Sequence, residues 1–143
     1  MKQQLLNWLF PILCLEALFV SCQQANSPTE LKLWYTRSAT NWMTSALPIG
    51  NGELGAMFFG GITREQVQFN EKTLWTGSTE KRGAYQSFGD VYIDFEGTDT
   101  CGVTDYRREL SLNDAIGKVS YRWKGVNYVR EYFASRPDGV VVV

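Results

Sequence analysis

Apolar and polar residues alternate with a period of two along four stretches of the chain. That is the period of a strand with one buried face. The apolar positions of these stretches are Leu31, Leu33 and Tyr35; Val67 and Phe69; Val91, Ile93 and Phe95; and Val119, Tyr121 and Trp123. Glycines recur between the stretches, as expected for turns. The pattern predicts an all-β fold, an antiparallel β-sandwich of short strands.

The clearest local element is a hairpin over residues 117–133, with Lys124-Gly125 as its two-residue loop. Such a loop needs a positive φ at both central positions, which Gly125 adopts freely and Lys124 at some cost. In this register Trp123 faces Val126, Tyr121 faces Tyr128 and Lys118 faces Glu131. Single helical turns are expected over residues 40–46 and 112–116.

The chain stops at Val140-Val141-Val142-Val143, which is typical of a strand buried on both faces. A strand at that place would leave an apolar edge open to other chains, which native proteins avoid. We therefore expect the sandwich to be incomplete and more protein to follow.

The first 21 residues have the layout of a secretory signal, with Lys2 before an apolar run from Leu5 to Val20. The run is shorter than the roughly 20 residues that a membrane-spanning helix needs. Val20-Ser21-Cys22 resembles a bacterial lipobox, so we expect a lipoprotein-type signal peptide (1–21), lipid attachment at Cys22, a polar tether (22–30) and the domain proper (31–143). Export to the bacterial periplasm, outer membrane or cell surface follows, with a membrane contact through the lipid. Plain secretion, with Cys22 incidental, is the alternative.

The amino-acid composition argues against several classes of catalytic and binding site. The chain has no histidine, which removes the commonest general base and the commonest zinc ligand. With 14 basic and 15 acidic residues its net charge is −1, so nucleic acid is not an expected partner. Cys101 would be the one cysteine left after signal removal and lipidation, and it lacks a histidine to activate it. We expect no metal and no cofactor.

Two segments could carry function. Gly50-Asn51-Gly52 is a weak phosphate-loop signal without a following Gly-Lys-Ser/Thr, and we expect it to be a packed turn between strands. Residues 68–77 place Asn70 and Glu71 at a strand end. The rings that could stack on a sugar are Trp34, Trp42, Trp75, Tyr35 and Tyr85, although we expect most of them in the core.

Glycoside hydrolysis uses two carboxyl groups about 5–9.5 Å apart. The candidates are Glu53 and Glu71, with Asp90 and Asp94 as second choices. Nothing in the sequence brings any pair together. We therefore assign no catalytic residue, and the substrate-binding residues are left unassigned.

Several motifs in series resemble the start of glycoside hydrolase family 95, the inverting α-L-fucosidases. They are Leu33-Trp34-Tyr35, Ala39 with Asn41-Trp42, residues 46–57, residues 68–77, Ala84-Tyr85-Gln86 with residues 89–93, residues 106–110 and residues 128–135. The segment between Gly77 and Ala84 is shorter than the Pro- and Gly-rich loop expected there. The order and spacing match over nearly all of residues 31–143.

The resemblance implies an N-terminal β-sandwich of the supersandwich type, followed in relatives by a helical linker, an (α/α)6 barrel and a C-terminal β domain. The family's catalytic carboxylates lie in the barrel, so none is carried over. The implied partners are that missing barrel and a glycan substrate with terminal α-L-fucose, or a galactose-type sugar. We expect the chain alone to be inactive. The alternatives are a lipid-anchored, non-catalytic carbohydrate-binding β-sandwich, or a plain scaffold domain.

Overall fold

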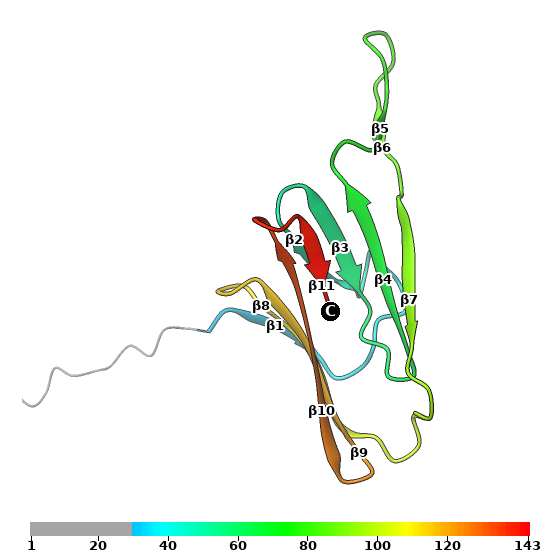
Figure 1. The fold of residues 1–143 in the computed structure, drawn as a ribbon, viewed down its shortest axis with the longest axis vertical. Coiled ribbons are helices and arrows are strands. Elements are labelled where there is room, and N and C mark those ends of the chain that lie inside the picture. Colours follow the sequence, from blue (N-terminus) through cyan, green and yellow to red (C-terminus); the bar gives the residue numbers. More distant parts are fainter. Residues whose placement is uncertain (1–29) are drawn as a thin grey trace, which may run out of the picture.

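The predicted β-sandwich is confirmed. A computed structural model describes residues 30–143, and its regular elements there are all β-strands (Figure 1). In chain order they are β1 (Lys32–Tyr35), β2 (Leu47–Gly50), β3 (Leu54–Phe58), β4 (Arg64–Glu71), β5 (Trp75–Thr76), β6 (Ala84–Tyr85), β7 (Gly89–Asp94), β8 (Thr104–Ser111), β9 (Ile116–Trp123), β10 (Val126–Ser135) and β11 (Val140–Val142). The predicted signal peptide, Cys22 and tether lie outside the described residues, apart from Glu30.

Two antiparallel sheets face each other (Figure 1). One has the strand order β1-β8-β9-β10-β11 and the other β2-β3-β4-β7. The short strands β5 and β6 pair only with each other and project from the end of the second sheet as a separate hairpin. Neighbours in sequence pair in most places, but β8 also pairs with β1, whose partner residues lie more than seventy positions away.

The core lies between the inner faces of the two sheets. Phe58 and Val119 are fully buried, and the Phe58 ring stacks on Tyr132 with centroids 4.3 Å apart. Gly117 lies directly against this pair, since an added Cβ there would be 2.4 Å from the Phe58 ring. The remaining buried apolar residues are Leu47, Ile49, Ala56, Phe59, Val67, Leu110, Tyr121 and Trp123.

The predicted hairpin register is confirmed. Trp123 pairs with Val126, Tyr121 with Tyr128 and Lys118 with Glu131. The Tyr121 and Tyr128 rings are stacked at 5.2 Å. Both loop residues have positive φ, 47° at Lys124 and 80° at Gly125, as a two-residue loop of this twist requires.

The expectation that the first and last strands are buried was wrong. In β1, on the face expected to be buried, Leu33 is 44% exposed and Tyr35 is 39% exposed, and β1 is the edge of its sheet. In β11, Val140 is 43% exposed, and Val143 beyond it is 46% exposed. This strand pairs with β10 along one side only, through Phe133, Ala134 and Ser135.

The two expected helical turns are hydrogen-bonded turns without helix. At residues 40–46, the Asn41 Oδ1 accepts hydrogen bonds from the Met43 and Thr44 N–H groups, and the Ser45 N–H donates to the Asn41 carbonyl at 3.1 Å. This is one closed turn, too short to propagate. Residues 112–115 join β8 to β9, and Ala115 has a φ of 57°, which ends any helical path.

Candidate functional site

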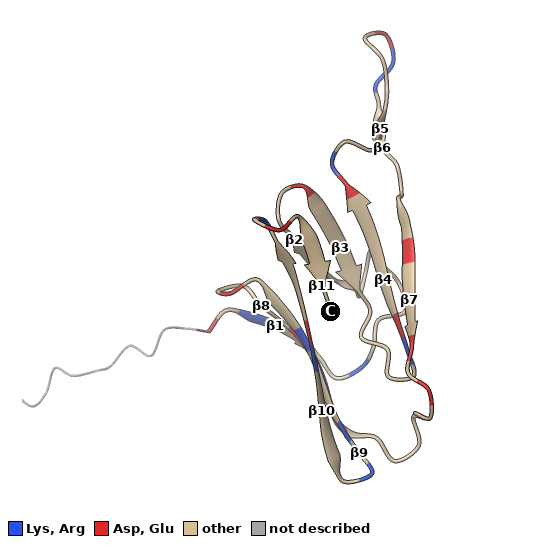
Figure 2. Cartoon of the chain, in the orientation of Figure 1, with Lys and Arg blue, Asp and Glu red and all other residues tan. Residues whose placement is uncertain are grey.

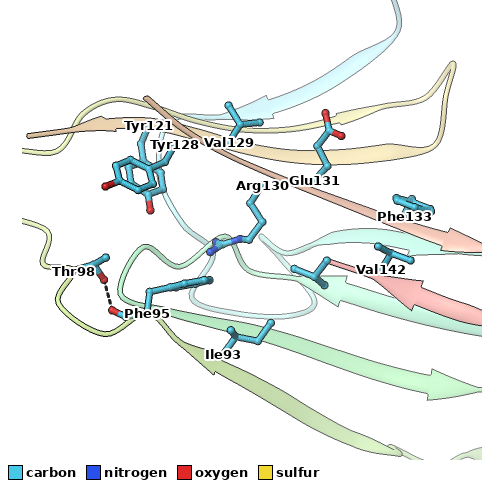
Figure 3. Close-up of a pocket in the computed structure, with 11 residues that line it drawn as sticks. Ile93, Phe95, Thr98, Tyr121, Tyr128, Val129, Arg130, Glu131, Phe133 and Val142 are labelled. Carbon is cyan, nitrogen blue, oxygen red and sulfur yellow. Dashed lines mark hydrogen bonds between the residues drawn. The ribbon is translucent and has the colours of Figure 1, made fainter. Parts of the chain in front are cut away.

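A cleft opens between the two sheets on the side of β7 and β10. Its volume is about 830 Å³, and Ile93 and Phe95 line it from one layer while Tyr128 and Phe133 line it from the other (Figure 3). A smaller apolar pocket continues along the same opening, between Val91 of β7 and Val141 of β11. The opening exposes apolar side chains on strands that lack a neighbour there within the described residues.

A buried ion pair lies beside the cleft. The Arg130 Nη2 donates to the Glu65 carboxylate at 2.5 Å and to the Gly61 carbonyl at 2.6 Å. Glu65 is fully buried, and the Arg130 side chain is 13% exposed. The guanidinium also lies 4.6 Å from the Phe95 ring centroid. Arg130 thus ties β10 to β4 across the interior of the sandwich.

The Glu65 carboxylate is well supplied with donors. Its Oε1 accepts hydrogen bonds from the N–H groups of Phe59, at 3.0 Å, and Gly60, at 2.8 Å. Its Oε2 also accepts the Tyr132 hydroxyl at 2.6 Å. A carboxylate held by four donors inside the core is an acceptor that fixes structure, because no lone pair is left facing a substrate.

Burial governs the titration of the groups around this pair. It raises the pKa of Tyr132, and the neighbouring Glu65 charge acts in the same direction. Burial also raises the pKa of Tyr106, whose hydroxyl donates to the Gly60 carbonyl at 2.6 Å. The pKa of Arg108 is lowered by burial, and its Nε is the one buried side-chain polar atom of residues 30–143 without a partner.

A second hollow lies on the outer face of the four-stranded sheet; we call it the outer groove. Its volume is about 500 Å³. Trp42, from the turn before β2, and Tyr85, from β6, line it together with Gly55 of β3 and Asn70 of β4. Trp42 is 49% exposed and Tyr85 is 63% exposed, so both rings are open to solvent.

The β5–β6 hairpin supports the Tyr85 side of the outer groove. The Trp75 ring meets the Tyr85 ring edge-on at 4.9 Å. The Gln86 Nε2 donates to the Thr76 Oγ1 at 2.9 Å, and the Gln86 N–H donates to the Leu74 carbonyl at 3.0 Å. These contacts hold Tyr85 in one place at the rim of the groove.

The candidate carboxylates are not arranged as an acid and base pair. Glu53 and Glu71 both border a shallow depression beside the outer groove. The Lys72 ammonium donates to Glu53 at 3.0 Å and lowers the pKa of that carboxyl, which is unfavourable for a general acid. The Glu71 carboxylate accepts hydrogen bonds from the N–H and the hydroxyl of Thr73.

The second-choice carboxylates lie on β7, away from Glu53. Asp90 accepts a hydrogen bond from the Gln66 Nε2 at 2.9 Å. Asp94 pairs with Arg64 at 3.4 Å on the exposed surface. Over residues 30–143 both signs of charge occur on both sheets (Figure 2).

The Gly50-Asn51-Gly52 segment is the packed turn that the sequence predicts. The Asn51 Oδ1 accepts hydrogen bonds from the Glu53 and Leu54 N–H groups, and its Nδ2 donates to the Ser135 carbonyl at 2.8 Å. Asn51 thus closes the β2–β3 turn and fastens it to the end of β10. The prediction that Asn70 and Glu71 end a strand is also confirmed, since β4 stops at Glu71.

Most of the rings expected in the core are at the surface instead. Among residues 30–143, Trp123 is buried, whereas Trp34, Trp42 and Trp75 are each about half exposed. Trp34 lies on the other sheet from the outer groove, with the Arg107 guanidinium 4.9 Å from its ring. The structure therefore brings Trp42, Trp75 and Tyr85 to one end of the four-stranded sheet and leaves Trp34 and Tyr35 elsewhere.

The Glu65–Arg130 pair was missed at the level of sequence. The signal was present, since Glu65 has the same strand parity as Val67 and Phe69, and Arg130 has that of Tyr128 and Tyr132. A charge at a core-facing position predicts a buried partner of opposite charge.

No group of three or more metal-ligating side chains was found in residues 30–143. No helix that could span a membrane was found in the same part of the chain. The Cys101 thiol is exposed there, and the Trp123 indole donates to the Cys101 carbonyl at 3.1 Å.

Comparison with known proteins gives a consistent result. The family model described as "Glycosyl hydrolase family 65, N-terminal domain" matches residues 33–84 and 78–143. The two matched segments overlap at residues 78–84, at the tip of the β5–β6 hairpin.

Two curated relatives are fucosidases by name. "Alpha-L-fucosidase 2" of Arabidopsis thaliana is 34% identical over 149 aligned residues, covering 78% of this chain and 18% of the relative. "Probable alpha-fucosidase A" of Aspergillus niger is 28% identical over 145 residues, covering 72% of this chain and 18% of the relative. The chain therefore spans about one fifth of the length of either protein. These matches confirm the resemblance seen in the sequence.

Proposed function

The chain belongs to the family of glycosyl hydrolase family 65 N-terminal domains, and we propose that it serves as the non-catalytic N-terminal domain of an exported α-L-fucosidase-like hydrolase. The parent enzyme would hydrolyse terminal α-L-fucosyl linkages with inversion. The observation that carries the proposal is the family match across residues 33–143 together with two fucosidase relatives of which the chain covers 18%.

The geometry supports a non-catalytic role. Glu53 is held as a carboxylate by Lys72, and Glu71 is engaged by Thr73. Hydrolysis with inversion needs one protonated acid and one base on opposite sides of the sugar. Glu53 and Glu71 offer no such pair, so we assign both roles to a further domain, the (α/α)6 barrel that the family resemblance implies.

The test is an activity assay of the full chain with 4-nitrophenyl α-L-fucoside. We expect release of nitrophenol at the rate of the buffer control. Turnover above that rate, lost in Glu71→Gln or Glu53→Gln, would overturn the non-catalytic role. Sequencing the gene past codon 143 tests the parent enzyme, since an open frame encoding helical sequence is expected there.

The membrane anchor is a separate part of the proposal and rests on Val20-Ser21-Cys22. A thioether-linked lipid on Cys22 would hold the domain at a bacterial membrane surface, because several acyl chains on one residue anchor stably. Expression in a bacterial host with a radiolabelled fatty acid tests it. We expect label in the membrane fraction for the natural chain and none for Cys22→Ala. Equal labelling of both chains would contradict the anchor.

A further inference from the structure

We propose that the outer groove binds a neutral sugar residue of a glycan. This goes beyond the proposed function, which assigns no ligand to this domain. The groove combines a glycine in its lining, two exposed aromatic rings and side-chain amides that have free hydrogen-bonding groups. Each of these features favours a pyranose ring over other ligands.

Gly55 leaves a gap in the lining of the groove, because it has no side chain. It lies on β3 and pairs with Asn70 of β4, which also lines the groove. A Cβ added to Gly55 would meet no atom within 4 Å. The next row, with Met57 and Gln68, carries full side chains and forms one wall.

Two exposed aromatic rings line the groove. Trp42 is 49% exposed and Tyr85 is 63% exposed. The hydrogen bonds of Asn41 fix the turn that carries Trp42, and the Trp75 contact fixes Tyr85. A rigid exposed ring gives an apolar platform for the C–H face of a sugar.

Amide groups line the same hollow. No hydrogen bond from the Gln68 side chain to another residue of 30–143 occurs, and the Asn70 Nδ2 is also without one. The Asn70 Oδ1 is used by the Glu71 N–H at 2.9 Å, which orients the amide. Because amides both donate and accept, they suit hydroxyl groups, which do the same.

The absence of charged side chains from the lining of the groove favours a neutral ligand. None of the twelve residues that line it is charged. Glu53, Glu71 and Lys72 border the adjoining depression, which shares Gly55, Asn70 and Tyr85 with the groove. A phosphorylated or carboxylated ligand would find no cation in the groove itself, whereas the next unit of a glycan has room in the depression.

The experiment titrates the full chain with methyl α-L-fucopyranoside and methyl β-D-galactopyranoside and follows backbone and indole N–H resonances by NMR. We expect saturable shifts of the Trp42 indole and the Gly55 amide with at least one sugar, while the buried Trp123 indole stays unchanged. Glycerol has hydroxyls but no ring, and it should give no saturable shift.

Variants distinguish a loss of sugar binding at the groove from a loss of folding. Gly55→Val fills the hollow with a side chain that strands favour, so binding should be lost while the unfolding midpoint is kept or raised. Trp42→Ala should raise the dissociation constant about fivefold to tenfold. Tyr92→Ala is the matched control, because Tyr92 is 48% exposed on β7 and lies outside the groove, with Arg64 against its ring. It should bind as the natural chain does.

Absence of saturable binding by the folded chain with both sugars would overturn the proposal. So would binding that survives in Gly55→Val and Trp42→Ala alike. The readout is binding, so it is independent of the fucoside assay: hydrolysis by the chain would overturn the non-catalytic role without touching the groove.

Discussion

Replacing Arg130 by Met should destabilise the domain strongly. The substitution removes the guanidinium that donates to Glu65, at 2.5 Å, and to Gly61, and that lies against the Phe95 ring. It leaves the fully buried Glu65 carboxylate without its ion-pair partner, although the charge of the buried Arg108 still acts on it. Removing one partner of a buried pair costs about 3–5 kcal/mol.

The remaining contacts set where in that range the loss falls. Three donors still reach the Glu65 carboxylate, namely the N–H groups of Phe59 and Gly60 and the Tyr132 hydroxyl. They solvate part of the stranded charge, so we expect a loss of about 3–4 kcal/mol. Domains of this size have a free energy of unfolding of about 5–15 kcal/mol, so the loss is a large share of the total.

The assay is equilibrium unfolding in urea, followed by tryptophan fluorescence and by circular dichroism to check for a two-state transition. Arg64→Met is the matched control, since Arg64 and Asp94 form an exposed pair at 3.4 Å. Its loss should stay within about 1 kcal/mol. A second variant, Arg130→Met with Glu65→Gln, should regain part of the stability because the neutral amide can still accept the two N–H groups.

Equal losses for Arg130→Met and Arg64→Met would refute this reasoning, because burial would then make no difference to the pair. A double variant less stable than Arg130→Met would also refute it. In that case the cost would lie in lost packing and hydrogen bonds, with no contribution from a stranded charge.

Three further predictions concern single positions. Gly117→Ala should lower the free energy of unfolding by about 1–3 kcal/mol, since its Cβ would lie 2.4 Å from the Phe58 ring. Gly55→Ala should be tolerated, because its Cβ meets nothing within 4 Å, and equal thermal midpoints for the two variants would contradict the packing of Gly117. Gly125→Ala should lower the free energy of unfolding, measured in urea, by about 1–2 kcal/mol, because φ is 80° at this position and Ala adopts that region poorly. An unchanged urea midpoint would mean that the loop has another conformation. Burial raises the pKa of Tyr106 and Tyr132 in the folded state, so their contribution to stability is present below pH about 10 and is lost as pH rises above it. The free energy of unfolding, measured from pH 8 to 11, should therefore fall less steeply in Tyr106→Phe than in the natural chain. Parallel curves for the two chains would argue against a buried Tyr106 hydroxyl.

Local features of the sequence determined much of the fold. The alternation of Val119, Tyr121 and Trp123 fixes which face of β9 is buried, because strand side chains point to opposite sides in turn. Lys124-Gly125 fixes the register of β9 on β10, because a two-residue loop leaves one way to pair the flanking strands. The motifs also sufficed to indicate the family.

Long-range pairing decided the rest. The sequence marked Trp42 and Tyr85 as rings that could stack on a sugar, but it did not place them at one hollow, which forms only where the turn before β2, the strands β3 and β4 and the β5–β6 hairpin meet. It likewise marked Glu65 and Arg130 as core-facing charges, but it did not pair them, since they lie 65 residues apart. β1 and β11 are exposed because each lies at an edge of its sheet and pairs with another strand along one side only. Local periodicity records which residues share a face, whereas the partner of that face is set by contacts between segments far apart in the chain.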